Sequence, residues 1–477
     1  MCQRLILLLI LLCVPRVLAQ ALPELGDASA AAISPMEERL LGERIMREIR
    51  RDPAYLDDPE MTDYVAALGG RLTARSGDAR QEFEFFVVRD SQINAFALPG
   101  GFIGIHTGLI LAAQGESEVA GVIAHEIAHV TQKHIARMVS HQSNSRLVSI
   151  AALAVAILAA RSNSQMGEAA LAFGQAGVIQ SQLNFTRDNE READRVGLQL
   201  LEGAGFDPRG MSGFFERLQR ATRVYEGGAP SYLRTHPMTH ERIADIQNRV
   251  EGLPYRQVPD SLDFQLIRAR LRAESENPRD AVAFFEACLA ERKFLSETAS
   301  RYGLVASLMR TRDFARAQRE IAFLRNTASP IIANLACRLA EAAGSSGKAL
   351  ACYQAALRMY PNTRTLIYGH VDQLLRAQQA AAALQLVEAR LKVQPEDARL
   401  YQLQARAHAA LGNGLMQHRA QAEAYLRSGQ LGAAVEQLQI ALKTGTGDFY
   451  QLSATEARLR ELRRLLAEQD GKRQNVK

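Results

Sequence analysis

The sequence predicts a mostly helical α+β domain with a small sheet, followed by an all-α region of repeated helix pairs. Up to about residue 250, amphipathic helical patterns are mixed with three short runs rich in β-branched and aromatic residues. From residue 263 onward the strand signals stop, and helix pairs recur with a period of about 34 residues. A chain of 477 residues is also long for one hydrophobic core, which favours separate domains.

The N-terminus has the pattern of a secretory signal peptide. Arg4 is followed by an apolar run over residues 5–14, and the small residue Ala19 precedes Gln20. Because the run is shorter than the roughly 20 apolar residues that span a bilayer, we expect cleavage near Ala19 and secretion. An uncleaved membrane anchor is the alternative.

Composition limits the compartment and the partners that we expect. Cleavage would leave Cys288, Cys337 and Cys352, an odd number that cannot pair completely. We interpret them as small buried residues, with a disulfide between Cys337 and Cys352 in an oxidising compartment as the alternative. The net charge of +5 falls to +3 without Arg4 and Arg16, which is too mild to indicate a nucleic-acid partner.

The first part of the mature chain is expected to pack two helices against a small antiparallel sheet. Apolar residues at helical spacing place the helices within residues 37–75. Strands are predicted over 83–88, 93–98 and 102–106, with a Pro-Gly-Gly turn at 99–101 between the last two.

Further helices follow the predicted strands. Residues 116–139 are expected to form one long helix, and helical patterning is again clear over 168–222. The apolar segment 147–160 is interpreted as a buried core helix, and a mobile flap or a segment that touches a membrane surface or a partner is the alternative. A loop rich in Gly and Pro is predicted over 226–237, before a last helix over 242–250.

The helix pairs beyond residue 263 have the period and the small and large residues of tetratricopeptide repeats. Ala349 and Tyr353 belong to the clearest unit, and Ala382 and Ala434 to two others. The spacing from Ala349 to Ala382 is in register, whereas the spacing from Ala382 to Ala434 is not. Residues 397–416 are therefore expected to be an irregular or extra helix. A generic helical bundle is the alternative.

The residues that carry chemistry are His125-Glu126-Ile127-Ala128-His129. On a helix, positions i and i+4 lie on one face, so both imidazoles can bind one metal ion. Glu126 lies beside them and can take a proton from a metal-bound water that attacks a peptide carbonyl. The pattern predicts one zinc ion per chain and a zinc-dependent endopeptidase. Two hydrogen-bonded core histidines are the structural alternative.

A catalytic zinc needs a third protein ligand. Gln132 and Ile135 exclude the class of zinc peptidases that has Gly and His at these positions. His134 lies nearly opposite His125 on the helical wheel and is interpreted as a surface residue.

A carboxylate from a later helix is the other option for the third ligand. In the charged stretch 187–194, Glu190 and Asp194 lie one turn apart on one face, and Glu192 points elsewhere. Glu190 is the predicted ligand. Asp194 behind it could hold a histidine tautomer, orient Glu190 or assist proton transfer. A charged face in contact with solvent is the alternative.

These residues together resemble the zinc peptidases related to HtpX and to the CAAX prenyl proteases, and the layout resembles the BepA-like periplasmic proteases. The resemblance implies a zincin-like metallopeptidase domain of the gluzincin type, with zinc bound by His125, His129 and Glu190. It also implies Glu126 as general base and Asp194 as a proton donor or supporting group. The matching residues include Asn94-Ala95-Phe96, Leu98 to Gly101, Gly108-Leu109-Ile110, Glu190 with Ala193-Asp194, and His236-Pro237 before Arg242.

The same resemblance implies a place and a role. Members of the HtpX type have transmembrane helices beside the site, which this sequence lacks, so a soluble periplasmic enzyme is expected. It would degrade misfolded or stalled outer-membrane proteins and assist their assembly as a chaperone. The repeat domain would contact unfolded polypeptides and the outer-membrane assembly machinery.

Two further features are assigned as hypotheses. The strand with Asn94, Ala95 and Phe96 ends at Pro99, as edge strands often do, and substrate could add to it as an extra strand. An ordinary structural strand is the alternative. His236 could stabilise an oxyanion, act as a fourth zinc ligand that closes the resting site, or be a hydrogen-bonded loop histidine.

These patterns divide the chain into five parts. The expected parts are a signal peptide (1–19), a metallopeptidase domain (20–252), a linker (253–262), a tetratricopeptide-repeat domain (263–447), and a capping helix with a tail (448–477). The basic amphipathic stretch 456–466 is expected to cap the repeats, with peripheral membrane contact as the alternative.

Two other functional classes compete with the protease. One is a chaperone or scaffold with a rarely active peptidase site, and the other is a zinc hydrolase of non-peptide substrates. The intact Glu126 argues against a pure scaffold, and the repeats argue for polypeptide partners rather than small molecules.

Overall fold

The computed structural model describes residues 34–77, 80–140, 187–222, 231–254 and 257–474. The predicted signal peptide and the apolar segment 147–160 lie outside the described residues. Within the described ranges, no helix combines the length and the apolar character needed to cross a membrane.

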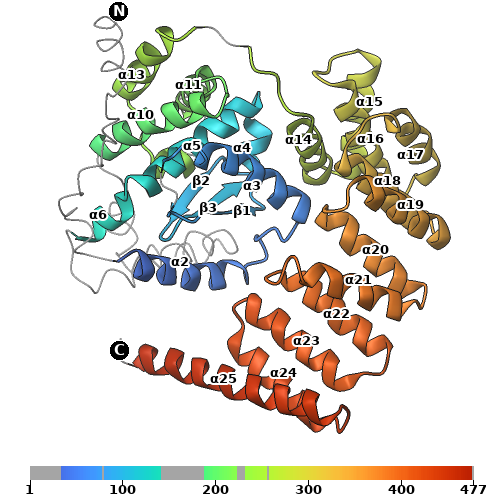
Figure 1. The fold of residues 1–477 in the computed structure, drawn as a ribbon. Helices are drawn as coiled ribbons and strands as arrows, with labels where there is room; N and C mark the ends of the chain where they lie inside the picture. Colours follow the sequence, from blue (N-terminus) through green and yellow to red (C-terminus); the bar gives the residue numbers. More distant parts are fainter. Residues whose placement is uncertain (1–33, 78–79, 141–186, 223–230, 255–256, 475–477) are drawn as a thin grey trace, which may run out of the picture.

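A small mixed sheet lies at the centre of the N-terminal part (Figure 1). β1 (Glu84–Val88) is parallel to β3 (Phe102–His106), and β2 (Ala95–Leu98) is antiparallel to β3, so the strand order is β1-β3-β2. The prediction of an antiparallel sheet is therefore correct for the β2–β3 hairpin and wrong for β1. The tight turn fixes the direction of β3 relative to β2, but it does not fix which edge β1 joins.

Both faces of the sheet are buried. Alternate residues of β1 face opposite sides, so Phe85 and Val87 contact one hydrophobic cluster while Phe86 and Val88 contact another. Helix α2 (Pro35–Ile49) covers the second face, and helix α3 (Pro59–Thr73) packs on the first. This burial on two sides explains why the strands are almost continuously apolar.

The predicted long helix over 116–139 is two helices. Helix α5 (Glu116–Thr131) ends at Gln132, and Lys133 has a left-handed φ of 53° before helix α6 (His134–Ser140) begins. The sequence has no Gly or Pro at 132 or 133 to announce this break. Its consequence is that His134, predicted to be a surface residue, is fully buried.

The remaining helices of the N-terminal part pack around α5 and the sheet. The predicted loop over 226–237 contains a one-turn helix, because Tyr232 and Leu233 are buried there instead of facing solvent. The helices are α4 (Thr107–Ala112), α10 (Arg187–Gly203), α11 (Arg209–Thr222), α12 (Ser231–Thr235) and α13 (His240–Glu251).

The C-terminal part is a regular series of helical hairpins. The first helices of successive hairpins begin every 33 to 35 residues, and α22 keeps this period. The expectation of an irregular helix at 397–416 is therefore wrong. The spacing looked out of register because Ala382 lies in the second helix of its hairpin and Ala434 in the first helix of a later one.

The helices of these hairpins follow one another closely along the chain. They are α14 (Leu262–Ser275), α15 (Pro278–Ala290), α16 (Glu297–Arg310), α17 (Phe314–Ile321) with the short η2 (Ala322–Leu324), α18 (Pro330–Ala342), α19 (Ser346–Met359), α20 (Arg364–Arg376), α21 (Ala380–Leu391), α22 (Ala398–Ala410), α23 (Gly414–Arg427), α24 (Leu431–Lys443) and α25 (Phe449–Gln474).

A disulfide joins Cys337 of α18 to Cys352 of α19. The interpretation of these two cysteines as unpaired buried residues is therefore wrong. The two helices form one hairpin, which brings residues 15 apart in sequence face to face. Cys288 is free.

The hydrophobic core of the N-terminal part continues into the first hairpins. One cluster includes residues of α3 and α5 together with Phe264, Ile267 and Leu335 of α14 and α18. A buried polar contact lies beside it, where Arg270 of α14 bonds Glu60 of α3 at 2.7 Å. The first hairpins therefore share the hydrophobic core of the sheet-containing part.

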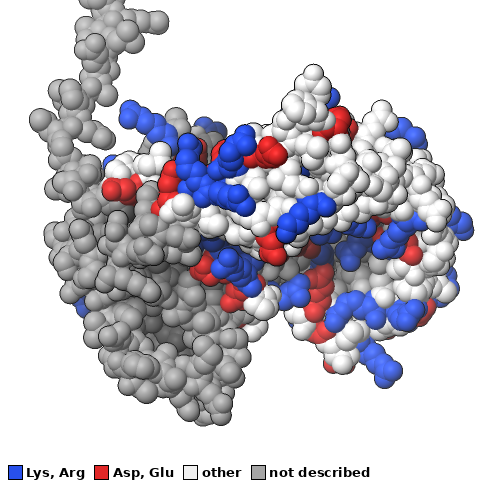
Figure 2. All heavy atoms as spheres, turned by 90° about the horizontal axis from the view of Figure 1, so that it is seen from below, with Lys and Arg blue, Asp and Glu red and all other residues white. Residues whose placement is uncertain are grey.

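Basic and acidic side chains are interspersed on the face shown in Figure 2, which is seen from below Figure 1. In α25, Arg458 bonds Glu423 at 2.8 Å and Arg460 pairs with Glu456. These pairs partly neutralise the positive charge that the sequence places on this helix.

Candidate active site

Helices α5 and α10 approach each other closely at one glycine. A Cβ atom on Gly197 would lie 3.2 Å from both Cα and N of His125, so only a glycine fits here without displacement. This close approach places Asp194 and Glu190, which lie one and two turns before Gly197 on the same helix, beside the histidines of α5.

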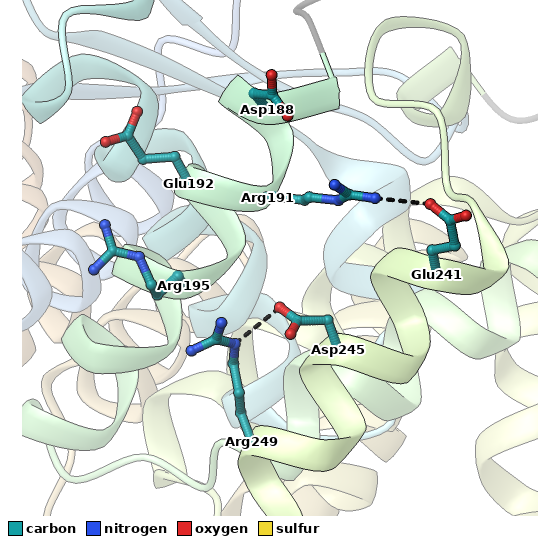
Figure 3. Close-up of a pocket in the computed structure, with 7 residues that line it drawn as sticks. All are labelled: Asp188, Arg191, Glu192, Arg195, Glu241, Asp245 and Arg249. Carbon is teal, nitrogen blue, oxygen red and sulfur yellow. Dashed lines mark hydrogen bonds and ion pairs between the residues drawn. The ribbon is translucent and has the colours of Figure 1, made fainter.

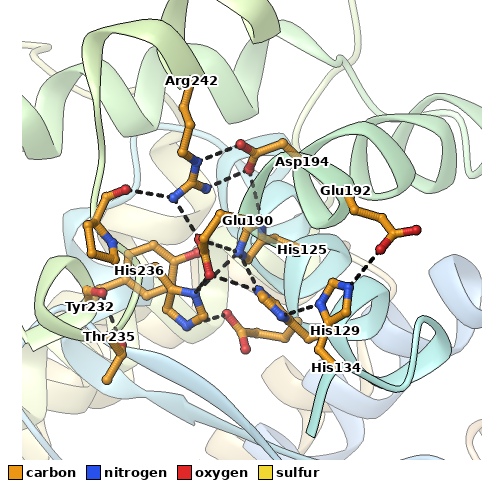
Figure 4. Close-up of polar contacts among 12 residues, drawn as sticks. His125, His129, His134, Glu190, Glu192, Asp194, Tyr232, Thr235, His236 and Arg242 are labelled. Atoms are coloured by element: carbon orange, nitrogen blue, oxygen red, sulfur yellow. Dashed lines mark hydrogen bonds and ion pairs between the residues drawn. The ribbon is translucent and has the colours of Figure 1, made fainter. Parts of the chain in front are cut away.

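Four side chains meet at this crossing (Figure 4). His125, His129, Glu190 and His236 each direct one potential ligand atom into a group whose members all lie within 4.8 Å of one another. None of the four side chains is more than 2% exposed. The structure thus brings together three predicted metal ligands and the histidine that was assigned three alternative roles.

The distances within the group fit a tetrahedral zinc site. His125 Nε2 lies 2.9 Å from His129 Nε2 and 3.4 Å from His236 Nδ1, and Glu190 Oε1 lies 3.4 Å from His129 Nε2. Metal–ligand bonds of about 2.0–2.1 Å in a tetrahedron would separate neighbouring ligand atoms by about 3.3 Å. Imidazole nitrogens and a carboxylate oxygen are also the donors that zinc prefers.

Glu126 lies at the edge of this group. Its side chain is 1% exposed, and Oε1 has no hydrogen-bond partner among the described residues while lying 3.5 Å from His236 Nε2. Burial raises the pKa of Glu126, although the charges of His236 and His125 oppose the rise. A buried carboxylate with a free oxygen and a raised pKa is suited to accept a proton.

Asp194 lies behind His125, on the side away from the group. Its Oδ1 is 3.0 Å from His125 Nδ1, so it holds the nitrogen that does not face the other ligands. Burial disfavours a charged His125 ring, but the hydrogen bonds to Asp194 and Glu190 outweigh burial and raise the His125 pKa to about 9. A carboxylate in this position fixes the ring and its tautomer when a metal is bound.

Arg242 of α13 ties the two carboxylates of α10 together. It is 2% exposed, bonds Asp194 through Nε and Nη2 at 2.7 Å, and contacts Glu190 Oε2 through Nη1 at 2.6 Å. Burial alone would raise the pKa of Asp194, but hydrogen bonds from His125 and Arg242 hold it below its usual value. The motif search singled out His125 and Glu190 but gave Arg242 no role.

His236 follows the one-turn helix α12 and points into the group. Its backbone N–H bonds the carbonyl of Tyr232, and the two rings stack with centroids 4.7 Å apart. Its Nδ1 lies 3.0 Å from Glu190 Oε1. These contacts place His236 inside the group.

The predicted substrate strand lies at a sheet edge, beside α5. Because the His106 N–H donates to the carbonyl of Asn94, the backbone groups of Asn94 and Phe96 face β3. The alternation of a strand then turns the backbone groups of Ala95 and Ala97 outward, away from β3. Ala97 also contacts Glu126 through a backbone hydrogen bond, so this edge adjoins the site.

A charged pocket lies on another face of α10, between this helix and α13 (Figure 3). Arg191 pairs with Glu241 and Arg249 with Asp245 across or beside it. The pocket is separate from the buried group because Glu190 and Asp194 face α5. Its lining residues are Asp188, Arg191, Glu192, Arg195, Glu241, Asp245 and Arg249.

A buried His-Glu-X-X-His helix, a carboxylate from a second helix and a free carboxylate base define the site of a zinc metallopeptidase. The comparisons with known proteins agree with this class. The family model described as peptidase family M48 matches residues 59–250.

The chain is also similar to named proteases over almost its whole length. It is 31% identical to the beta-barrel assembly-enhancing protease of Escherichia coli O157:H7, with 94% of this chain and 92% of the relative covered. It is 30% identical to the protein of the same name from Yersinia pestis, with 93% and 92% covered. The mitochondrial metalloendopeptidase OMA1 of Schizosaccharomyces pombe is 35% identical, over 41% of this chain and 54% of the relative.

The chain therefore belongs to peptidase family M48 and is a zinc-dependent metalloendopeptidase. The predicted enzyme class and metal are confirmed.

Proposed function

We propose that this enzyme cleaves misfolded or stalled outer-membrane proteins in the periplasm and also assists their assembly. The observation that carries the proposal is the buried group of His125, His129 and Glu190 beside Glu126, in a chain that aligns over 94% of its length with a beta-barrel assembly-enhancing protease. The predicted signal peptide, with cleavage near Ala19, supports export to the periplasm.

In this proposal His125, His129 and Glu190 hold the zinc ion. When bound, zinc supplies Lewis acidity, which lowers the pKa of water and polarises the scissile carbonyl. Glu126 takes the proton of the attacking water through its free Oε1 and delivers it to the leaving amine. Asp194 holds the His125 ring, so its role is support, with no direct part in proton transfer.

Substrate would bind as an added strand along β2. The outward N–H and carbonyl of Ala95 and the outward carbonyl of Ala97 supply the hydrogen bonds, and the hydrogen bond from the Ala97 N–H to Glu126 brings the added strand to the catalytic base. An Ala95→Pro variant removes one outward N–H without touching the pairing with β3. We expect slower cleavage with unchanged zinc content and thermal stability, and unchanged cleavage would exclude this binding mode.

His236 would close the site at rest as a fourth ligand. Its Nδ1 lies within 3.4 Å of both His125 Nε2 and Glu190 Oε1. His236 would therefore occupy the fourth coordination position, which the attacking water must take during catalysis. His236→Ala should then raise the cleavage of small unfolded substrates. A loss of activity would instead support stabilisation of the oxyanion, and no change would show that His236 has neither role.

The helical hairpins are proposed to be tetratricopeptide repeats that bind polypeptides and the assembly machinery. Their period of 33 to 35 residues supports this assignment. A groove lies between them and the sheet-containing part, lined by Arg50, Tyr55 and Phe85 on one side and by Tyr368 and Arg399 on the other. Aromatic and arginine side chains are enriched at protein–protein interfaces, which supports a polypeptide partner here.

The proposal is tested with one outer-membrane β-barrel protein in two states. The unfolded protein should be cut, and the same protein folded in detergent should resist. A Glu126→Gln variant should bind the unfolded protein without cutting it. If both states resist the wild type while Glu126→Gln restores assembly in cells that lack the enzyme, the chain acts mainly as a chaperone or scaffold, which is the alternative.

A further inference from the structure

His129 is held from behind by two residues that the sequence analysis set aside. His129 Nδ1 lies 2.8 Å from Nδ1 of His134, and His134 Nε2 lies 3.1 Å from Oε2 of Glu192 (Figure 4). Arg137 donates to the same Glu192 oxygen at 2.8 Å. A chain of polar contacts therefore runs from Glu192 on α10 through His134 on α6 to a ring at the centre of the site.

The proton positions along this chain follow from the chemistry of imidazole. If His129 binds zinc through Nε2, that nitrogen has no proton, and Nδ1 must carry the N–H of the neutral ring. Nδ1 of His134 then has to accept this hydrogen bond, so the proton of the neutral His134 ring is on Nε2. That proton points to the Glu192 carboxylate, which accepts it.

We propose that His134 and Glu192 are positioning residues that fix the ring orientation and tautomer of His129 for zinc binding. Glu192 orients His134, and His134 accepts from His129, so that Nε2 of His129 keeps its free electron pair toward the metal. The inference rests on the proposed role of His129 as a ligand.

The other histidine of the helix has an equivalent support. Asp194 lies 3.0 Å from His125 Nδ1, so both helix histidines have a group from behind that fixes the ring nitrogen that does not face the site. Both supporting carboxylates, Asp194 and Glu192, come from α10. Asp194 contacts His125 directly, whereas His134 lies between Glu192 and His129. Partners of this kind commonly change metal affinity by about 10- to 100-fold.

The backbone supports the same conclusion. Lys133 adopts a left-handed φ of 53°, which residues other than Gly, Asn and Asp seldom adopt, and this turn brings the His134 side chain against His129. His134 is fully buried at 0% exposure, and a buried imidazole is costly unless both nitrogens have partners. The break between α5 and α6 thus places His134 where its ring can accept a hydrogen bond from His129.

A pair of substitutions at one position separates positioning from packing. In His134→Asn, the side-chain oxygen occupies roughly the place of Nδ1 and can accept from His129, whereas His134→Leu fills the space without an acceptor. Glu192→Leu removes the far end of the chain. Glu241→Gln, which alters an exposed ion pair of the neighbouring helix α13, is the control.

The measurement is the zinc dissociation constant, obtained by competition with a chromogenic chelator, together with the thermal midpoint of the zinc-free protein. We expect His134→Leu to weaken zinc binding by about 10- to 100-fold. His134→Asn should recover most of this loss, Glu192→Leu should weaken binding several-fold, and Glu241→Gln should have no effect. Equal zinc affinity of the Asn and Leu variants would overturn the proposal.

Two further results keep the test decisive. If His134→Leu does not fold, wild-type affinity in Glu192→Leu would equally overturn the proposal, and a several-fold loss there with folding intact would support it. If His129→Ala keeps its zinc, the proposed ligand set itself is wrong. If His129→Ala loses zinc while His134→Leu binds it like the wild type, only this inference fails.

Discussion

At the scale of single residues, Arg242 allows two neighbouring buried carboxylates to remain charged in the interior. Glu190 and Asp194 are each no more than 2% exposed and lie one turn apart on α10. Two buried negative charges at this separation would repel each other and favour protonation. The guanidinium of Arg242 bonds both, so they stay charged, one toward the metal site and one toward His125.

Replacing Arg242 should therefore destabilise the fold strongly. Arg242→Leu leaves two buried carboxylates without their cation, and breaking a buried pair in this way costs about 3–5 kcal/mol. Arg191→Leu is the matched control, because its pair with Glu241 also joins α10 to α13 but is exposed (Figure 3) and contributes at most about 1 kcal/mol. Urea denaturation with zinc in excess measures both, and equal losses would contradict this account.

The sequence predicts the residues of the site unevenly. His125, Glu126 and His129 follow from one helical motif, and Glu190 follows from the need for a third ligand on a later helix. Arg242 and Glu192 carry no local pattern, because their roles depend on how α10, α13 and α6 pack. The wrong assignment of His134 has a definite cause, since a helical wheel assumes that the helix continues.

At the scale of elements, the contact between α5 and α10 depends on Gly197. A Cβ at this position would lie within 3.2–3.3 Å of the backbone of His125 and Ala124, which cannot move without shifting the catalytic helix. Replacing Gly197 by Ala would raise the helix propensity of α10. This gain is opposed by a steric cost at the contact between α10, which carries Glu190, and α5, which carries the two histidines.

Gly197→Ala should lower both stability and zinc affinity. We expect a loss of about 1–3 kcal/mol in the free energy of unfolding from overpacking, and weaker zinc binding because Glu190 is moved relative to His125. Gly213→Ala on α11 is the control, since a Cβ there meets nothing within 4 Å and should stabilise by up to about 1 kcal/mol. Unfolding by chemical denaturant tests both, and a stabilising Gly197→Ala would refute the steric argument.

The types of the elements were more predictable than their connections. Helical periodicity located α2, α3, α10 and α13, and the Pro-Gly-Gly turn located the β2–β3 hairpin, because these signals are local. The parallel pairing of β1 and the break between α5 and α6 at Lys133 depend on tertiary contacts. The position of β2 at an edge of the described three-stranded sheet also follows only from the strand order β1-β3-β2.

At the scale of the whole molecule, the sequence boundary at 253–262 does not divide the hydrophobic core. Phe264, Leu266 and Ile267 of α14 are at most 1% exposed and belong to the same cluster as α3 and α5. At the N-termini of α5 and α14, Asp260 accepts from the backbone N–H of Glu116, and Glu116 accepts from Ser261. The catalytic helix is thus capped by the chain that leads into the first hairpin.

Truncation should reveal this dependence. A chain that ends at residue 252 loses three fully buried side chains of α14, each contributing about 1.5–3 kcal/mol, and should be unstable or aggregate. A chain that ends at residue 362 keeps α14 to α19, the shared core and the disulfide, and should melt cooperatively near the temperature of the full chain. Scanning calorimetry compares them, and a stable fragment ending at 252 would contradict the shared core.

The most direct test of the central claim compares a protein of residues 20–477 with its Glu126→Gln variant. Zinc is measured by elemental analysis, and cleavage is measured on unfolded casein. The account predicts about one zinc ion per chain in both proteins and cleavage by the wild type alone, because Glu126 moves the proton while His125, His129 and Glu190 hold the metal. A folded wild-type protein without zinc, or a Glu126→Gln variant that cleaves like the wild type, would contradict it.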